Sequence, residues 1–156
     1  MITISRETDY ACRVILHLAL EGPGSRVTAQ EIAGQRLIPR ALARRVVTRL
    51  RGAGLVVTVR GSDGGIALAR PPEQISLLQV VEALDGPVAL NACTIEPEGC
   101  PLMPACTVHS AWIRARAVLR QHLDQITFDK LTNPQEASIE QDPDPSSVAF
   151  DPPSVI

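Results

Sequence analysis

The sequence predicts a mainly α-helical fold with one small β-hairpin, and three observations support this prediction. Two short helical patterns with a tight connection precede two β-prone runs joined by a glycine-rich turn, which is the order of a winged helix-turn-helix. A proline-punctuated segment with three cysteines follows. A long amphipathic stretch comes next and is predicted to be a dimerisation helix, because one helix cannot bury such a stripe alone.

Three helices are predicted in the first third of the chain. Residues 4–20 carry apolar side chains at helical spacing, and the glycines and proline at 22–24 end that helix. A second helix opens at Thr28, which forms a capping box with Glu31. The third helix spans 39–51, with a proline in its first turn, apolar positions on one face and arginines on the other.

The remaining elements follow in order along the chain. Residues 55–60 and 66–70 are the predicted strands of the hairpin, and 76–84 is a further helix. Residues 88–106 contain three prolines and fit no regular element, whereas 107–127 again show helical periodicity. We therefore expect a winged helix-turn-helix region at 1–72, a loop and dimerisation helix at 73–131, and a disordered acidic tail at 132–156.

The charges are strongly segregated along the chain. The tail from residue 133 holds five acidic residues and no Lys or Arg, so the net charge of −2 becomes −2 + 5 = +3 without it. Between Arg26 and Arg70 nine arginines stand against Glu31 and Asp63, a local charge of +7. This composition indicates an anionic partner for the region that contains the third helix.

The sequence excludes some protein classes and compartments. No apolar run is long enough to span a membrane, and Glu7 and Asp9 stand where a signal peptide would be basic and then apolar. We therefore expect a cytoplasmic protein without a membrane partner. In that compartment clustered cysteines favour metal binding or redox chemistry over structural disulfides.

The arginines of the third helix predict DNA binding. A basic run is often only a solvated helix face. Here, however, the basic residues are almost all arginine, face one way and lie on the second helix of a helix-turn-helix, and arginine suits both phosphate and guanine edges. The predicted contacts to double-stranded DNA are Thr28, Arg40, Arg44, Arg45, Arg49 and Arg60.

Three of the four cysteines lie within fourteen residues, as Cys93-x6-Cys100-x5-Cys106. Zinc sites usually pair ligands two to four residues apart, so the wider spacing fits an iron–sulfur cluster better. A metal-free redox switch of the three thiols is the alternative. His109 lies one helical turn beyond Cys106 and can supply a fourth ligand in cis, whereas Asp9 could supply it from the partner subunit.

The other cysteine and histidines have simpler interpretations. Cys12 lies one turn from Asp9 and is expected to be a small buried apolar side chain rather than a ligand. His17 and His122 are expected to have structural roles.

Several further motifs accompany the cysteines: the run at 9–11, Ile38-Pro39, the runs at 53–56 and 60–72, His109 with Trp112, and the run at 123–127. On these motifs and the three cysteines, the chain resembles the Rrf-type family of bacterial winged-helix regulators over about residues 1–131. Together these motifs are highly specific for the family. Cys93 and Cys100 are separated by six residues, where five is the more familiar number.

The resemblance implies a homodimer that binds a pseudo-palindromic operator and carries a cluster on Cys93, Cys100 and Cys106. His109 matches the iron–sulfur cluster regulators of the family, which implies a 2Fe–2S cluster. Asp9 matches the nitric-oxide-sensing repressors, which implies a 4Fe–4S cluster with the carboxylate supplied across the dimer. We favour Asp9 and 4Fe–4S, because an oxygen ligand is labile and leaves a reactive iron.

The predicted function is that of a DNA-binding transcriptional regulator, expected to be a repressor, which senses nitric oxide, redox or iron status through its cluster. A metal-free thiol sensor on the same fold is the first alternative, and an iron–sulfur carrier the second. The carrier leaves the arginine helix and the hairpin unexplained. An enzyme is not expected, because the sequence shows no paired carboxylates, phosphate-binding loop or nucleophile–base pair.

Overall fold

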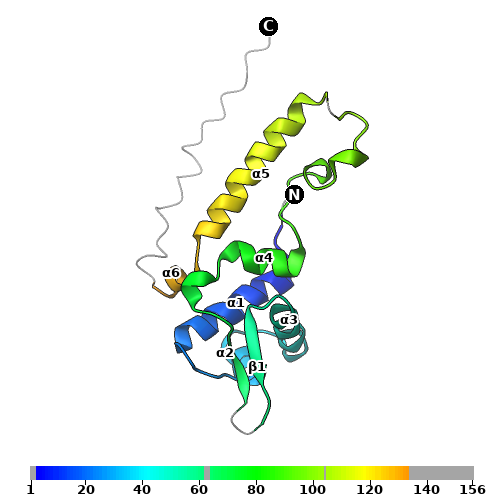
Figure 1. The fold of residues 1–156 in the computed structure, drawn as a ribbon. Coiled ribbons are helices and arrows are strands. Elements are labelled where there is room, and N and C mark those ends of the chain that lie inside the picture. Colours follow the sequence, from blue (N-terminus) through cyan, green and yellow to red (C-terminus); the bar gives the residue numbers. More distant parts are fainter. Residues whose placement is uncertain (1–2, 62–63, 104, 134–156) are drawn as a thin grey trace, which may run out of the picture.

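The computed structural model describes residues 3–61, 64–103 and 105–133. Its first three helices are α1 (Arg6–Glu21), α2 (Ala29–Gln35) and α3 (Arg40–Gly52), and they form the predicted helix-turn-helix body (Figure 1). The hydroxyl oxygen of Ser5 caps α1 by accepting from the Thr8 N–H at 3.2 Å. The predicted capping box at the start of α2 is present.

The core of this body is built from one face of each helix. On α1 the residues Ala11, Val14, Ile15 and Leu18 are buried, at the spacing of a single helix face. On α3 the buried face consists of Ala43, Val46, Val47 and Leu50, and it packs against α1 and α2. Leu42 lies just beyond the edge of this face and is only half-buried, because the face is centred on Ala43 and Leu50.

The hairpin consists of β1 (Val56–Val59) and β2 (Gly65–Leu68), paired antiparallel with Val56 opposite Leu68. It projects from one end of the body, next to α2 and α3 (Figure 1). Val27, just before α2, pairs with Ile66 through two backbone hydrogen bonds of 3.0 and 2.8 Å. The hairpin is therefore fixed to the start of α2 as well as to the end of α3.

After the hairpin come a 3₁₀ turn, η1 (Pro72–Gln74), and a fourth helix, α4 (Leu77–Asp85). Ser76 caps α4 in a second capping box. The helix α4 packs on α1 and α3, and its Val80 and Leu84 belong to the same core as those helices. The core thus extends beyond residue 72, where the sequence places a regional boundary; that boundary stays a prediction.

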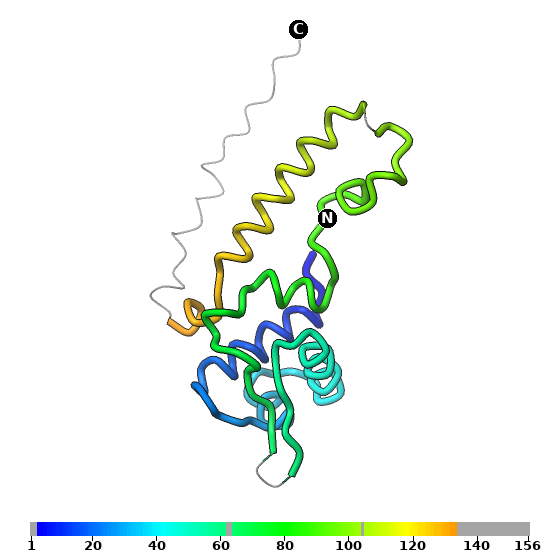
Figure 2. The backbone as a smooth tube through the Cα atoms, viewed as in Figure 1, coloured from blue at the N-terminus to red at the C-terminus, as the bar shows by residue number. Residues whose placement is uncertain are grey.

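The cysteine segment leads from α4 to the long helix α5 (Thr107–Gln125), and Figure 2 shows both running away from the body. The segment contains two short 3₁₀ turns, η2 (Ala92–Thr94) and η3 (Pro97–Gly99), where the sequence predicted no regular element. No residue of α5 is fully buried. The contacts of α5 are chiefly with α4 and η2.

The end of α5 differs from the prediction by two residues. The chain leaves the helix at Ile126 because its backbone pairs with the start of α4: the Leu77 N–H donates to the Ile126 carbonyl at 2.8 Å, and the Phe128 N–H to the Ile75 carbonyl at 3.0 Å. A short helix that was not predicted, α6 (Phe128–Thr132), follows and packs on α1 and η1. Phe128 is 1% exposed and joins the core.

Two expectations concern the chain as a whole. Most of the predicted acidic tail, residues 134–156, lies outside the described residues. Within the described ranges, no helix combines the length and the apolar character that crossing a membrane requires.

Candidate DNA interface and cysteine loop

An exposed polar surface lies where the start of α2 meets the first turns of α3. Arg40 and Arg44 of α3 are exposed and line a hollow of about 250 Å³ together with Thr28, Ala29 and Gln30. Both guanidinium groups stand at the end of α3 that, in a helix-turn-helix, faces base edges and phosphates. The fold thus brings Thr28, Arg40 and Arg44 together on one surface.

A second hollow, of about 420 Å³, continues this surface towards the hairpin. It shares Thr28, Ala29 and Arg44 with the first hollow and is completed by residues of α3 and of both strands, including Thr48, Thr58 and Gly65. Arg60 is exposed at the end of β1, beside Gly61 of this hollow. The α2 N-terminus, α3 and the hairpin therefore form one continuous candidate DNA interface.

Thr28 also has a structural role in this surface. Its hydroxyl donates to the Glu31 carboxylate at 2.7 Å and accepts from the Glu31 N–H at 3.2 Å, and its own N–H donates to the carboxylate at 2.8 Å. These hydrogen bonds from Thr28 hold the pKa of Glu31 below its ordinary value of 4.5. The Glu31 carboxylate therefore forms part of the cap of α2.

Arg45 and Arg49 form ion pairs with another helix of the same chain. Arg45 forms an ion pair with Glu7 of α1. Arg49 pairs with the same carboxylate at 3.3 Å and also donates to the Leu84 carbonyl at the end of α4. Arg49 thus faces α1 and α4, unlike Arg40 and Arg44, and DNA contacts by Arg45 and Arg49 stay predictions.

The three clustered cysteines occupy different positions in the loop between α4 and α5. Cys93 lies within η2, Cys100 directly follows η3, and Cys106 is the N-cap residue of α5. All three are half-buried free thiols. They are not gathered into a metal site: among the described residues, no three Cys, His, Asp or Glu side chains lie close enough together to hold an ion.

The two candidate fourth ligands differ in their surroundings. The Asp9 carboxylate forms an ion pair of 2.7 Å with Arg13, one turn along α1. Nδ1 of His109 is shielded from solvent and has no hydrogen-bond partner. An unpartnered imidazole nitrogen one turn beyond Cys106 is available as a ligand in cis.

The donor set of the loop fits an iron–sulfur cluster chemically. Thiolates are the usual cluster ligands, and imidazole also serves. Without the metal nothing draws three thiols together, since metal binding itself supplies the free energy that closes such a site. The proline-rich loop would have to close around the cluster, with Cys106 and His109 held in place by α5.

The remaining cysteine and histidines have the surroundings expected of structural residues. Cys12 packs against the core, where burial and the nearby Asp9 carboxylate raise the pKa of its thiol to about 12. His17 is buried and its Nδ1 accepts from Nε of Arg36 at 3.2 Å. His122 is exposed on α5.

Three polar residues near the loop were not predicted from the sequence. Arg116 and Arg120 of α5 and Glu82 of α4 connect the start of the cysteine loop to both helices. The spacing of the two arginines on one helix face was visible in the sequence. Their partners were not visible, because two of them are backbone carbonyls that only the folded loop presents.

Comparison with known proteins agrees with this architecture. Residues 4–134 match the sequence profile of the Rrf2 family, described as an iron-dependent transcriptional regulator. The chain belongs to the Rrf2 family.

Rrf2 relatives are similar over most of their length. The transcriptional regulator NsrR of Shouchella clausii is 33% identical over 80% of this chain and 84% of its own. IscR of Pectobacterium carotovorum is 31% identical over 81% and 77%. The solved structure of the oxidised form of Staphylococcus aureus CymR is similar with a TM-score of 0.64 and 29% identity, over 85% of this chain and 97% of that one.

The family membership has direct consequences for function. The protein is an Rrf2-family transcriptional regulator, and this family relationship implies binding to DNA. It is not an enzyme, since its relatives regulate transcription. The predicted fold class, a mainly helical winged helix-turn-helix with a two-stranded hairpin, is confirmed by the structure and by its structural neighbours.

Proposed function

We propose that this protein is a repressor whose affinity for its operator depends on an iron–sulfur cluster held by Cys93, Cys100 and Cys106. The observation that carries the proposal is the set of three free, half-buried thiols on one loop, in a chain whose family is described as iron-dependent. When bound, the cluster supplies iron that reacts with nitric oxide or oxygen. A transcriptional regulator acts where the DNA is, so the proposed compartment is the cytoplasm.

The fourth ligand is proposed to be Asp9 of the partner subunit, with a 4Fe–4S cluster. A 2Fe–2S cluster with His109 is the competing arrangement, and the unpartnered Nδ1 of His109 supports it. Two variants separate the two arrangements. If Asp9 is the ligand, Asp9→Ala lowers cluster retention and His109→Ala does not. If His109 is the ligand, His109→Ala lowers cluster retention and Asp9→Ala does not.

The residues of the candidate DNA interface have distinct proposed roles. Arg40 and Arg44 contact bases and phosphates from α3, Thr28 contacts a phosphate from the start of α2, and Arg60 contacts the backbone beside the hairpin. In a homodimer the two copies of α3 would bind half-sites about one DNA turn (~34–36 Å) apart, so the operator would be pseudo-palindromic.

The dimer contact is proposed to be the apolar stripe of α5. Val108 and Trp112 of this stripe are 55% and 40% exposed, and no residue of the helix is fully buried. A second copy would cover these side chains. When the cysteine loop relaxes, the spacing of the two α3 helices is lost and operator affinity falls.

The test combines a spectrum with a binding measurement. Protein purified without oxygen is expected to show visible absorption with stoichiometric iron and sulfide, and to bind operator more tightly than the stripped protein at the same salt concentration. Equal operator affinity of the two forms would refute cluster dependence. The absorption and EPR spectra of the loaded protein would distinguish 4Fe–4S from 2Fe–2S.

A second candidate function is a metal-free thiol switch. It is supported by the similarity to CymR, which has been solved in an oxidised form, and by the free cysteines of this chain. This function requires a colourless protein that stays colourless after reconstitution and forms a reversible disulfide among the loop cysteines. Iron-loaded protein without such a disulfide would exclude it.

A further inference from the structure

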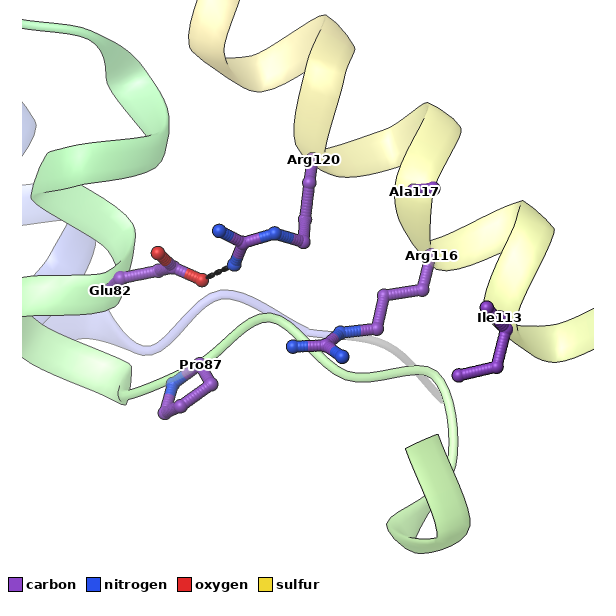
Figure 3. Close-up of a pocket in the computed structure, with 6 residues that line it drawn as sticks. All are labelled: Glu82, Pro87, Ile113, Arg116, Ala117 and Arg120. Carbon is purple, nitrogen blue, oxygen red and sulfur yellow. Dashed lines mark hydrogen bonds and ion pairs between the residues drawn. The ribbon is translucent and has the colours of Figure 1, made fainter. Parts of the chain in front are cut away.

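The start of the cysteine loop is held by one side chain of the long helix. Arg116 of α5 is half-buried and donates to two backbone carbonyls: Nε to that of Val88 at 2.7 Å, and a terminal guanidinium nitrogen to that of Thr94 at 2.8 Å. Figure 3 shows its guanidinium group extending from α5 towards the loop. The two carbonyls enclose the segment 88–94, which contains Cys93.

A second residue holds the same segment from the other side. The Glu82 carboxylate of α4 accepts from the Val88 N–H at 3.1 Å and pairs with Arg120 of α5 (Figure 3). Val88 is therefore bound through its N–H to α4 and through its carbonyl to α5. Thr94 is 5% exposed, and its hydroxyl donates to the Asn91 carbonyl at 2.7 Å, which closes the segment at its far end.

The rest of the loop has only local hydrogen bonds. The Gly99 N–H donates to Glu96, the Cys100 N–H to Pro97, and the Met103 N–H to Cys100, all between backbone groups of the loop. Among the described residues from 95 to 105, none shows a hydrogen bond to a helix outside the loop. Cys93 is thus the loop cysteine that lies within the segment anchored at Val88 and Thr94, where Glu82 of α4 and Arg116 of α5 bind it.

We propose that Arg116 is a positioning residue, which holds Cys93 in place before any metal is bound, so that Cys100 and Cys106 complete the site around it. The proposal rests on the cluster-binding function proposed above. A guanidinium group suits the task because its planar fork donates to two carbonyls at once and remains charged at every physiological pH. A preplaced first ligand reduces the ordering that the loop must undergo when the cluster binds.

The experiment compares Arg116→Ala with Arg114→Ala in full-length, metal-free protein. Arg114 is exposed on the same helix and is the matched control. Each cysteine is labelled with a maleimide under reducing, anaerobic conditions, and its rate is read by peptide mass spectrometry. Loss of charged hydrogen bonds at both ends of the segment should raise the Cys93 rate in Arg116→Ala by about tenfold, with Cys106 unchanged.

The conservative variant Arg116→Lys shows whether the fork geometry matters. An ammonium group on a flexible stem cannot hold both carbonyls in the same fixed geometry, so the Cys93 rate should lie between those of the wild type and Arg116→Ala. This variant also covers the case in which Arg116→Ala does not fold, which circular dichroism would reveal. An unchanged Cys93 rate in both variants, or an equal rise at Cys106, would overturn the proposal.

A second readout links the positioning role to the cluster. After anaerobic reconstitution, Arg116→Ala should lose iron to a chelator several-fold faster than Arg114→Ala, with its visible spectrum altered. Iron loss at the same rate in the two variants would contradict the role of Arg116 in the site. If wild-type protein binds no iron, the proposed function fails, whereas the labelling rates still decide whether Arg116 anchors Cys93.

Discussion

Cys12 and the three loop cysteines have the same functional group in very different surroundings. Burial, reinforced by the Asp9 carboxylate, raises the pKa of Cys12 from an ordinary value of 9.0 to about 12, which lowers its thiolate fraction roughly a thousandfold. The thiolate is the form that reacts with alkylating reagents. In metal-free protein at pH 8, we therefore expect iodoacetamide to modify Cys93, Cys100 and Cys106 while Cys12 stays largely unmodified.

The denatured protein is the control for this prediction. In urea all four thiols should react at similar rates, because burial and the nearby carboxylates no longer act on Cys12. Modification of Cys12 in the folded protein as fast as in urea would show that its thiol is not protected as described.

His17 gives the fold a pH dependence. Burial, together with the charge of Arg36, lowers the pKa of His17 below its ordinary value of 6.5. Below about pH 6.5 the unfolded chain therefore binds more protons at this position than the folded protein does. The free energy of unfolding should fall as the pH drops from 7.5 to 5.5, measured by urea denaturation.

The variant His17→Gln isolates this contribution. Glutamine can still accept from Arg36 but does not titrate, so the pH dependence of stability should become shallower over the same interval. An identical slope in wild type and variant would assign the pH dependence to other groups.

At the scale of single elements, the connection between α2 and α3 contains a strained residue. Leu37 is the one described residue other than glycine with a positive φ, 53°, and its side chain is 82% exposed. A left-handed conformation costs a residue with a Cβ about 1–2 kcal/mol, and glycine avoids this at the price of a more flexible unfolded chain. We expect Leu37→Gly to raise the free energy of unfolding by about 0.5–1 kcal/mol.

Alanine at the same position is the matched control. Leu37→Ala removes the exposed side chain but keeps the Cβ, so the free energy of unfolding should stay close to that of the wild type. Equal stabilisation by alanine and glycine would mean that the side chain, rather than the backbone conformation, is unfavourable.

The arginines of α3 fall into two groups, one lining the candidate DNA interface and one bound to α1 and α4, and substitution should separate their roles. Arg44 lines both hollows of the candidate interface, whereas Arg49 binds Glu7 and the end of α4. Arg44→Ala should lower the slope of log affinity against log salt by about one unit if it contacts a phosphate, or relax sequence preference if it contacts a base. Its stability should be unchanged.

If Arg49 binds only Glu7 and the end of α4, Arg49→Ala should show the opposite pattern. Loss of a partly exposed, charged hydrogen bond to α4 should lower the free energy of unfolding by about 1 kcal/mol, with the salt dependence of DNA binding preserved. Operator titrations at several salt concentrations, with urea denaturation beside them, measure both effects. A changed salt slope in Arg49→Ala with unchanged stability would place Arg49 on the DNA instead.

At the scale of the whole molecule, the proposed dimer predicts that a charge placed on the apolar stripe of α5 should separate the two subunits. Trp112 belongs to the apolar stripe and is 40% exposed. Trp112→Glu would bury a carboxylate in the dimer contact, which is strongly unfavourable without a partner. Analytical ultracentrifugation should show a shift from dimer to monomer, with the circular dichroism of the winged-helix body preserved.

Gln121→Glu is the matched control. Gln121 lies nine residues after Trp112, which is two and a half helical turns, so the variant adds the same charge on the opposite side of α5. It should leave the dimer intact and DNA binding unchanged. Monomeric wild-type protein, or dimers of Trp112→Glu as stable as those of Gln121→Glu, would show that α5 is not the contact.

Local patterns were sufficient to predict much of this fold. The cap at Thr28, the glycine and proline breaks and the apolar periodicities placed the helices to within a few residues, because caps and amphipathic faces are properties of a few neighbouring residues. The short helix α6 was missed, because its five residues carry little periodicity and are held by pairing with residues 75–77 from elsewhere in the chain.

The residue types of the candidate sites could likewise be read from the chain, since arginines on a helix and cysteines on a loop are visible as such. Their partners depended on the folded arrangement: Arg49 turns to α4, His109 keeps an unpartnered nitrogen, and Arg116 binds two carbonyls of the cysteine loop. Contacts between residues distant in sequence follow from how the helices pack, and no local pattern encodes which side chain will meet which carbonyl.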